Sequence, residues 1–142
     1  MINGTSIILD SSVALSWFFK DESNDYADAV LANLAQATAI VPTIWPLEIA
    51  NALLVGERRG RSTAEQALTW TILVSALPIA IDNETAGFVF DAILSIGRAH
   101  SLSAYDAAYI ELAARRGLRL ATLDTRLRKA AGAAGIALFS AE

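Results

Sequence analysis

Short apolar runs alternate with longer stretches of helical periodicity along this chain. Each run is short enough for a buried strand, and several of them stop at an acidic residue or a proline. The pattern predicts strands at residues 5–9, 39–41, 78–82, 119–123 and 136–139.

Apolar residues recurring three and four positions apart predict helices between these strands. After the first strand, Ser11 or Ser12 can cap a helix that runs through Phe19. A Ser/Thr-x-x-Glu/Gln pattern at residues 62–66 predicts the start of another helix, which extends to about Ser75. Further helices are expected at about 25–36, 44–59, 83–100, 103–116 and 124–132.

The alternation of strands and helices predicts an α/β fold with a mainly parallel sheet covered by helices on both faces. No internal repeat, low-complexity tract or linker interrupts the pattern. We therefore expect residues 1–142 to form a single domain.

Composition narrows the class of protein. The chain has 142 residues, of which 54% are hydrophobic and 18% charged, and this suits helices packed on a buried sheet. Without cysteine it has no disulfide and no thiolate ligand or nucleophile. No apolar run approaches the roughly 20 residues that span a bilayer, and no secretion signal is evident, so we expect no membrane association and a cytoplasmic location. The net charge of −4 argues against diffuse nucleic-acid binding.

Four acidic residues stand in apolar or small-residue surroundings, where solvated acids are uncommon. Asp10 and Asp124 each follow a predicted strand, and Glu48 and Asp106 each lie near a helix start. Sites in parallel sheets form at the carboxyl ends of strands, so we expect Asp10, Glu48 and Asp124 at one edge of the sheet. The helix of Asp106 follows another helix, and the pattern alone does not place it.

When carboxylates are gathered in this way, their negative charges have to be balanced. At an effective dielectric constant of about 20 and a separation of about 5 Å, each ionised pair repels by roughly 3 kcal/mol. A hard divalent cation removes that repulsion, and Mg²⁺ or Mn²⁺ suits an all-oxygen site. Zinc suits it less, because the chain has no cysteine and a single histidine.

Each acid also has a simpler interpretation. Asp10 and Asp124 could be N-caps or turn residues, Asp106 could favour the positive end of its helix, and Glu48 could satisfy its own helix start. For one acid alone, this structural role is the more economical explanation. Four acids in this placement favour a shared site.

At these residues the chain resembles a PIN domain, and more narrowly the VapC-type toxin ribonucleases. The resemblance covers nearly the whole chain. Four segments carry it in the expected order: Ile8 to Phe18, Val41 to Leu53, Leu102 to Ala113 and Leu120 to Leu127.

The resemblance implies a three-layer α/β/α sandwich and metal-dependent endonucleolytic cleavage of RNA, with Mg²⁺ as cofactor and Mn²⁺ as a substitute. Asp10 and Asp106 would be the principal metal ligands. Glu48 and Asp124 would complete the acidic site, directly or through water. All four acids of the family pattern are present.

Other residues fit supporting roles. Ser12 and Thr122 match small hydroxyl positions of the family and would orient carboxylates or water. Arg126 and Arg128 follow Asp124 within two turns and are candidates for a rim that contacts RNA phosphates.

The resemblance also implies a bacterial or archaeal toxin–antitoxin pair and a homodimer. The partner would be a small, VapB-like antitoxin that lays an amphipathic segment across the toxin. It could insert an arginine among the acids.

Three further functions compete with that of a toxin. A phospho-acceptor receiver domain also uses strand-end acids and Mg²⁺, but it needs adjacent acids after the first strand and a lysine after a late one. Here Asp10 stands alone, and the lysines are Lys20 and Lys129. The second is a PIN nuclease of RNA maturation or DNA repair, and the third is a non-catalytic interaction domain.

Overall fold

The sheet is small, parallel and flanked by helices. The computed structural model describes residues 6–140. Within them, four parallel strands stand in the order β3–β2–β1–β4. The strands are β1 (Ile7–Leu9), β2 (Ala39–Val41), β3 (Ile79–Ile81) and β4 (Arg119–Ala121).

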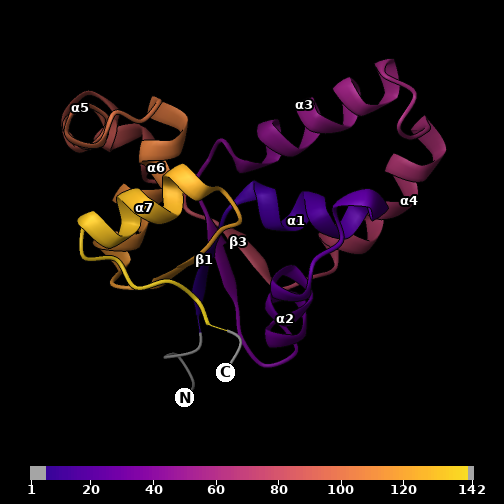
Figure 1. Ribbon diagram of the computed structural model, residues 1–142, viewed down its shortest axis with the longest axis horizontal. Coiled ribbons are helices and arrows are strands. Elements are labelled where there is room, and N and C mark those ends of the chain that lie inside the picture. Colours follow the sequence, from indigo (N-terminus) through magenta and orange to yellow (C-terminus); the bar gives the residue numbers. More distant parts are fainter. Residues whose placement is uncertain (1–5, 141–142) are drawn as a thin grey trace.

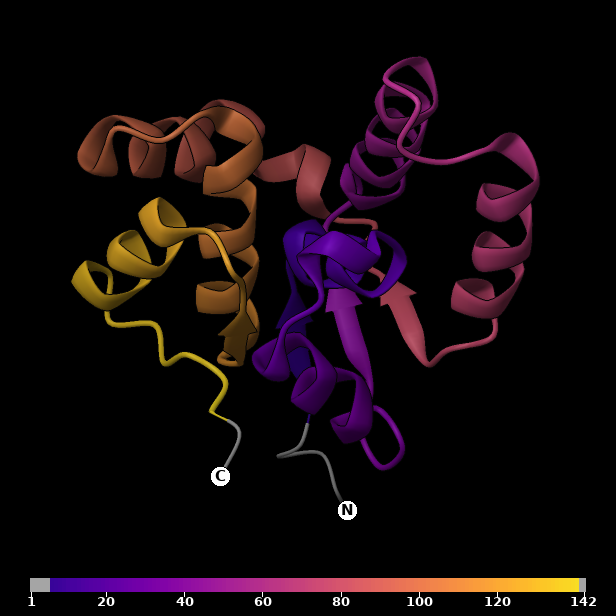
Figure 2. The ribbon, with the colours of Figure 1, turned by 45° about the vertical axis from the view of Figure 1, so that its right-hand side comes forward.

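Helices cover both faces of the sheet, which confirms the predicted α/β/α fold (Figure 1). The α-helices are α1 (Ser11–Phe18), α2 (Asp25–Asn33), α3 (Trp45–Arg58), α4 (Ala64–Ser75), α5 (Leu94–His100), α6 (Ala104–Arg116) and α7 (Thr125–Ala133). Figures 1 and 2 show α3 and α4 together on one side of the molecule and α5, α6 and α7 on the other. Within residues 6–140, no helix is long and apolar enough to cross a membrane.

Local signals in the sequence account for several helix ends. Side chains of Asn24, Thr63, Ser103 and Asp124 accept hydrogen bonds from backbone N–H groups at the starts of α2, α4, α6 and α7. The expected capping arrangement before α4 is a full capping box of Thr63 with Gln66. Gly117 ends α6 in the left-handed region, at φ +66°.

The core centres on β1. Its three residues are fully buried, and they pack in one cluster with residues of β2, β4 and the surrounding helices. Ile8 is paired with Ile40 on one side and with Leu120 on the other. Strand β3, at the edge of the sheet, is more exposed. The centre of the sheet is therefore the most deeply buried place from which to position a site.

Two expectations for secondary structure need correction. The helix expected at residues 83–100 is broken into a 3₁₀ turn, η3 (Thr85–Phe88), a π turn, η4 (Val89–Ile93), and α5. The π turn ends at Ile93, which is buried against Ala107 and Ala108 of α6, so packing overrides a regular α-helix here. A further 3₁₀ turn, η2 (Lys20–Glu22), follows α1.

The final strand expected at residues 136–139 is reduced to one parallel bridge between Leu120 and Leu138. Two backbone hydrogen bonds make it: Leu120 N–H donates to the Ala137 carbonyl (3.0 Å), and Phe139 N–H donates to the Leu120 carbonyl (2.8 Å). Pairing at a single position is too short for a full strand.

Candidate active site at the carboxyl edge of the sheet

The predicted acids come from four separate segments. Asp10 directly follows β1, and Asp124 lies three residues beyond β4 at the start of α7. Glu48 and Asp106 lie in the first turns of α3 and α6. Strands β1 and β4 are neighbours, and the strand order reverses between them, which is where open parallel sheets form their sites.

Asp10 is the most buried of the four, with 5% of its surface exposed. Its Oδ2 accepts hydrogen bonds from the hydroxyls of Ser12 (2.7 Å) and Thr122 (2.6 Å). Burial raises the pKa of Asp10, the two hydroxyls lower it, and the nearby Asp106 and Asp124 raise it further. The carboxyl is thus held in place by neutral donors, and these leave its charge unbalanced.

The two hydroxyls also join the ends of β1 and β4. The Leu123 N–H donates to Ser12 Oγ (3.0 Å), and the Asp124 N–H donates to Thr122 Oγ1 (3.0 Å). Thr122 therefore accepts from the backbone of one acid while it donates to the side chain of another. This network fixes the position of Asp10 relative to the backbone of Asp124.

Glu48 is half-buried and accepts a hydrogen bond at Oε1 from the Tyr109 hydroxyl, 2.5 Å away. Burial raises the pKa of Glu48, hydrogen bonds from the Tyr109 hydroxyl and the Ser11 side chain lower it, and the charges of Asp10 and Asp106 raise it. Burial also raises the pKa of Tyr109, so its hydroxyl stays protonated and remains the donor. The effects on its pKa show that Glu48 lies close enough to Asp10 and Asp106 for their charges to act on it.

Asp106 lies in the first turn of α6, where its backbone N–H donates to Ser103 Oγ (3.1 Å). Burial raises the pKa of the Asp106 carboxyl, as does Asp124, whereas Arg126 lowers it. The pattern of the chain had left this residue unplaced. Its charge acts on Asp10 and Glu48 as well.

Asp124 has two roles at once. Its Oδ1 accepts from the N–H groups of Arg126 (2.9 Å) and Leu127 (3.2 Å), so the N-cap interpretation is correct. The same carboxylate raises the pKa of both Asp10 and Asp106. A capping role and membership of an acidic cluster are therefore compatible.

The two arginines considered for an RNA rim differ. The exposed Arg126 donates to the Ser101 carbonyl (3.1 Å) and acts on Asp106 through its charge. Arg128 donates to the Thr122 carbonyl (2.8 Å), and its guanidinium lies over the Tyr26 ring, 5.1 Å from the centroid. Arg128 is thus engaged within the fold, whereas Arg126 is exposed and its charge reaches Asp106.

The donors at this edge are chemically suited to a hard cation, because they are carboxylate and hydroxyl oxygens. Their charges act on one another, as the shifts in the pKa of Asp10, Glu48 and Asp106 indicate. Among residues 6–140, however, no three His, Cys, Asp or Glu side chains are arranged so that they could hold a metal ion between them. Direct ligation by all four acids would need side-chain rearrangement, and water could bridge the remaining distance.

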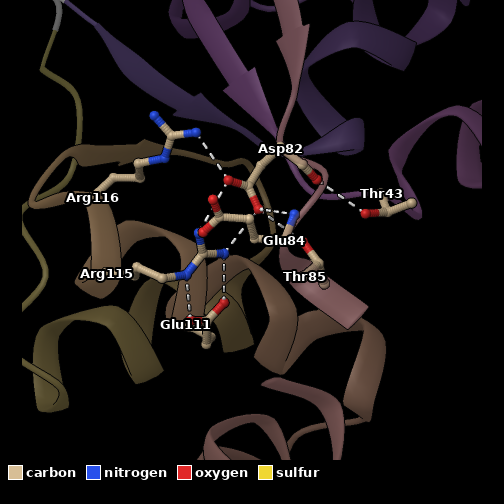
Figure 3. Close-up of polar contacts among 7 residues, drawn as sticks. All are labelled: Thr43, Asp82, Glu84, Thr85, Glu111, Arg115 and Arg116. Carbon is tan, nitrogen blue, oxygen red and sulfur yellow. Dashed lines mark hydrogen bonds and ion pairs between the residues drawn. The ribbon is translucent and has the colours of Figure 1, made fainter. Parts of the chain in front are cut away.

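A fifth acid, Asp82, follows β3 and belongs to a different network (Figure 3). Its side chain is only 1% exposed. Arg115 binds both carboxylate oxygens (3.0 and 2.9 Å), and Arg116 binds Oδ1 (2.9 Å). Asp82 also caps the following turn, since its Oδ2 accepts from the Glu84 N–H (3.2 Å) and the Thr85 hydroxyl (3.4 Å). The negative charge of Asp82 is therefore balanced by the two arginines.

Sequence reasoning missed two of these contacts. The first is the contact of Tyr109 with the acidic edge, although its position three residues after Asp106 puts both side chains on one face of α6. That spacing was the available signal. The pairing of Asp82 with Arg115 had no local signal, because 33 residues separate the two.

Comparison with known proteins supports the fold. The sequence matches the family model of the PIN domain over residues 7–133, so the chain belongs to the PIN domain family. PIN domains are generally metal-dependent nucleases. A search of curated proteins returned no match.

Solved structures share the fold. The crystal structure of PAE2754 from Pyrobaculum aerophilum is similar at a TM-score of 0.60 and 22% identity, covering 88% of this chain and 86% of that one. The crystal structure of FitAcB from Neisseria gonorrhoeae is similar at a TM-score of 0.60 and 21% identity, covering 95% of this chain and 97% of that one.

Proposed function

We propose that this protein is a metal-dependent endoribonuclease that cleaves RNA phosphodiester bonds. The main support is the convergence of acids from four segments at the strand-order reversal. Within residues 6–140, none of these acids forms an ion pair with an arginine or lysine. Such an arrangement stores electrostatic repulsion that a divalent cation would relieve. The PIN fold and the all-oxygen donors support the same function.

We propose roles for the residues at this edge. Asp10 and Asp106 would be the principal ligands of Mg²⁺ or Mn²⁺, with Glu48 and Asp124 completing the site directly or through water. The bound cation would supply water activation and stabilisation of the charge developing on the phosphate. Ser12 and Thr122 orient the Asp10 carboxylate through Oδ2. The exposed Arg126 would attract a phosphate toward the acids.

A first experiment tests the site itself. We expect Asp10→Asn to lower RNA cleavage by about 100-fold or more, because loss of a ligand exceeds the 10–100-fold typical of a supporting residue. Chelation should abolish cleavage by the unaltered protein, and Mn²⁺ should restore it. Arg58→Ala, an exposed residue near the end of α3, is a matched control that should leave the rate unchanged. Full activity of both Asp10→Asn and Asp106→Asn with Mg²⁺ present would contradict the site assignment.

We further propose that residues 1–142 act as a single domain and as the toxin of a toxin–antitoxin pair, with a homodimer as the active form. Exposed apolar side chains on α3 and α4 support a protein partner, because such patches commonly mark interfaces. They are Leu47, Leu54, Leu68, Ile72 and Leu73. The expected partner is a small, VapB-like antitoxin encoded beside this gene.

Two measurements separate this role from RNA maturation or from a non-catalytic interaction domain. Brief induction in cells followed by mapping of new RNA 5′ ends should show cleavage at restricted sites together with growth arrest. The product of the adjacent gene should bind the protein and relieve the arrest. Cleavage limited to precursor ends, without arrest, would instead favour RNA maturation.

A further inference from the structure

Tyr109 combines a place in the core with a contact at the acidic edge. Its side chain is 0% exposed, and its ring belongs to the main hydrophobic cluster. It lies three residues after Asp106 on α6, so both side chains project from one face of that helix. The ring contributes to packing like that of any buried aromatic residue.

The hydroxyl makes a contact that packing alone does not require. It donates to Glu48 Oε1 at 2.5 Å and joins α6 to α3 across 61 residues of sequence. Tyr26 offers a comparison, because its hydroxyl donates to the main-chain carbonyl of Phe139 at 3.0 Å. A neutral carbonyl would therefore have sufficed as a partner for a buried phenol.

Glu48 needs such a restraint. A glutamate side chain has three rotatable bonds, and the charges of Asp10 and Asp106 disfavour its ionised form at this position. Without the Tyr109 hydroxyl, the Ser11 side chain alone would hold it against repulsion that favours rotamers pointing away from the other acids. A hydrogen bond to one carboxylate oxygen restricts the rotamer while the other oxygen can still bind a cation.

We propose that Tyr109 is a positioning residue whose hydroxyl holds the Glu48 carboxylate in the orientation in which it serves the divalent cation. The inference rests on the proposed function. The positioning role of Tyr109 differs from a packing role in one respect. Packing depends on the ring, which Tyr109→Phe keeps, whereas positioning depends on the hydroxyl, which Tyr109→Phe removes.

The test measures Mn²⁺ affinity directly, by the electron paramagnetic resonance signal of free Mn²⁺ in titrations of the intact protein. We expect Tyr109→Phe to weaken Mn²⁺ binding by about 10-fold, as is typical when the partner of a metal ligand is lost. Tyr26→Phe is the matched control, because it removes the hydroxyl of a partly buried tyrosine that packs against the core and is hydrogen-bonded to the main chain. Its Mn²⁺ affinity should equal that of the unaltered protein. Thermal unfolding of both variants reports any loss of packing separately.

A double-mutant cycle shows whether Tyr109 acts through Glu48. In a Glu48→Gln background, Tyr109→Phe should produce no further loss of Mn²⁺ affinity, because the carboxylate it positions is gone. An equal, additive loss in that background would overturn the inference. So would an unchanged Mn²⁺ affinity in Tyr109→Phe alone.

The outcomes also separate the two proposals. If the unaltered protein binds Mn²⁺ and Asp10→Asn weakens that binding, a null result for Tyr109→Phe overturns the positioning role and leaves the proposed function standing. If the unaltered protein binds no Mn²⁺, the proposed metal site and the role of Tyr109 are both overturned.

Discussion

Asp10 and Asp82 occupy equivalent places in the sheet and meet opposite surroundings. Each directly follows a parallel strand, β1 or β3, and each is at most 5% exposed. Asp82 lies between Arg115 and Arg116, as Figure 3 shows, and these arginines hold its pKa below the ordinary value. Asp10 receives two hydroxyl hydrogen bonds and lies near other acids, and burial raises its pKa.

The difference shows that position at a strand end does not by itself identify a functional acid. Both residues satisfy the positional rule, but Asp82 has its charge balanced by arginines and Asp10 has hydroxyl partners. A compensated carboxylate ties structural elements together, whereas an uncompensated one retains the capacity to bind a cation. The balance of charge, rather than the place in the fold, distinguishes the two acids.

The comparison predicts effects of opposite sign on stability. Asp82→Asn should lower the free energy of unfolding by about 3 kcal/mol, because it leaves the mostly buried Arg115 guanidinium without the carboxylate whose two oxygens it binds. Asp10→Asn should leave that free energy unchanged or raise it, because it removes repulsion from the other acids. Urea denaturation in chelator-containing buffer measures both. A loss of similar size in the two variants would contradict the distinction between a balanced and an unbalanced acid.

The two arginines that bind Asp82 should differ from each other. Arg115 is 18% exposed, binds both carboxylate oxygens, contacts Glu111 and lies over the Phe88 ring. We expect Arg115→Ala to cost about 2–3 kcal/mol of unfolding free energy, near the lower end for a buried pair because Arg116 remains. Chemical denaturation of the purified variant provides the measurement.

Arg116 makes the weaker of the two arginine contacts with Asp82. Its side chain is 43% exposed and makes a single bond to Asp82. Arg116→Ala should therefore lower the free energy of unfolding by about 1 kcal/mol or less, as measured for solvent-screened pairs. An effect as large as that of Arg115→Ala would show that the two arginines share the charge equally.

The ion pairs of Asp82 also predict a dependence of stability on acid pH. The hydrogen bonds from Arg115 and Arg116 lower the pKa of Asp82 from its ordinary value of 3.8. A carboxyl with a lowered pKa stabilises the fold at every pH above its unfolded pKa, and that contribution is lost as pH falls toward the folded pKa. The unaltered protein should thus lose more stability than Asp82→Asn on going from about pH 5 to about pH 2. Parallel curves of denaturation midpoint against pH would contradict this.

Features with a local cause were predictable from the sequence. The capping box of Thr63 and Gln66 is encoded within three residues, and the strand before Asp10 shows as an apolar run that stops at an acid. The α/β/α class followed from the alternation of such elements. The acids Asp10 and Glu48 were placed at the sheet edge by the same logic.

Features with a distant cause were not predictable. The Asp82 pairs depend on how α6 lies relative to β3, and nothing near residue 82 encodes that packing. Arg128 follows Asp124 closely in sequence, yet its side chain is held by Thr122 and Tyr26. The interruption of the helix at residues 85–93 likewise depends on where Ile93 packs.

The π turn η4 changes the directions in which side chains before and after it project from the helical segment. One extra residue in a helical turn offsets all residues before it by about 100° relative to those after it. Phe88 precedes the turn and lies beneath the Arg115 guanidinium, whereas Ile93 ends the turn and is buried against α6. Both contacts are made to the same helix. Deleting one residue from η4 would leave only one of them in phase, so the length of this segment, as much as its composition, keeps η3 attached to α6.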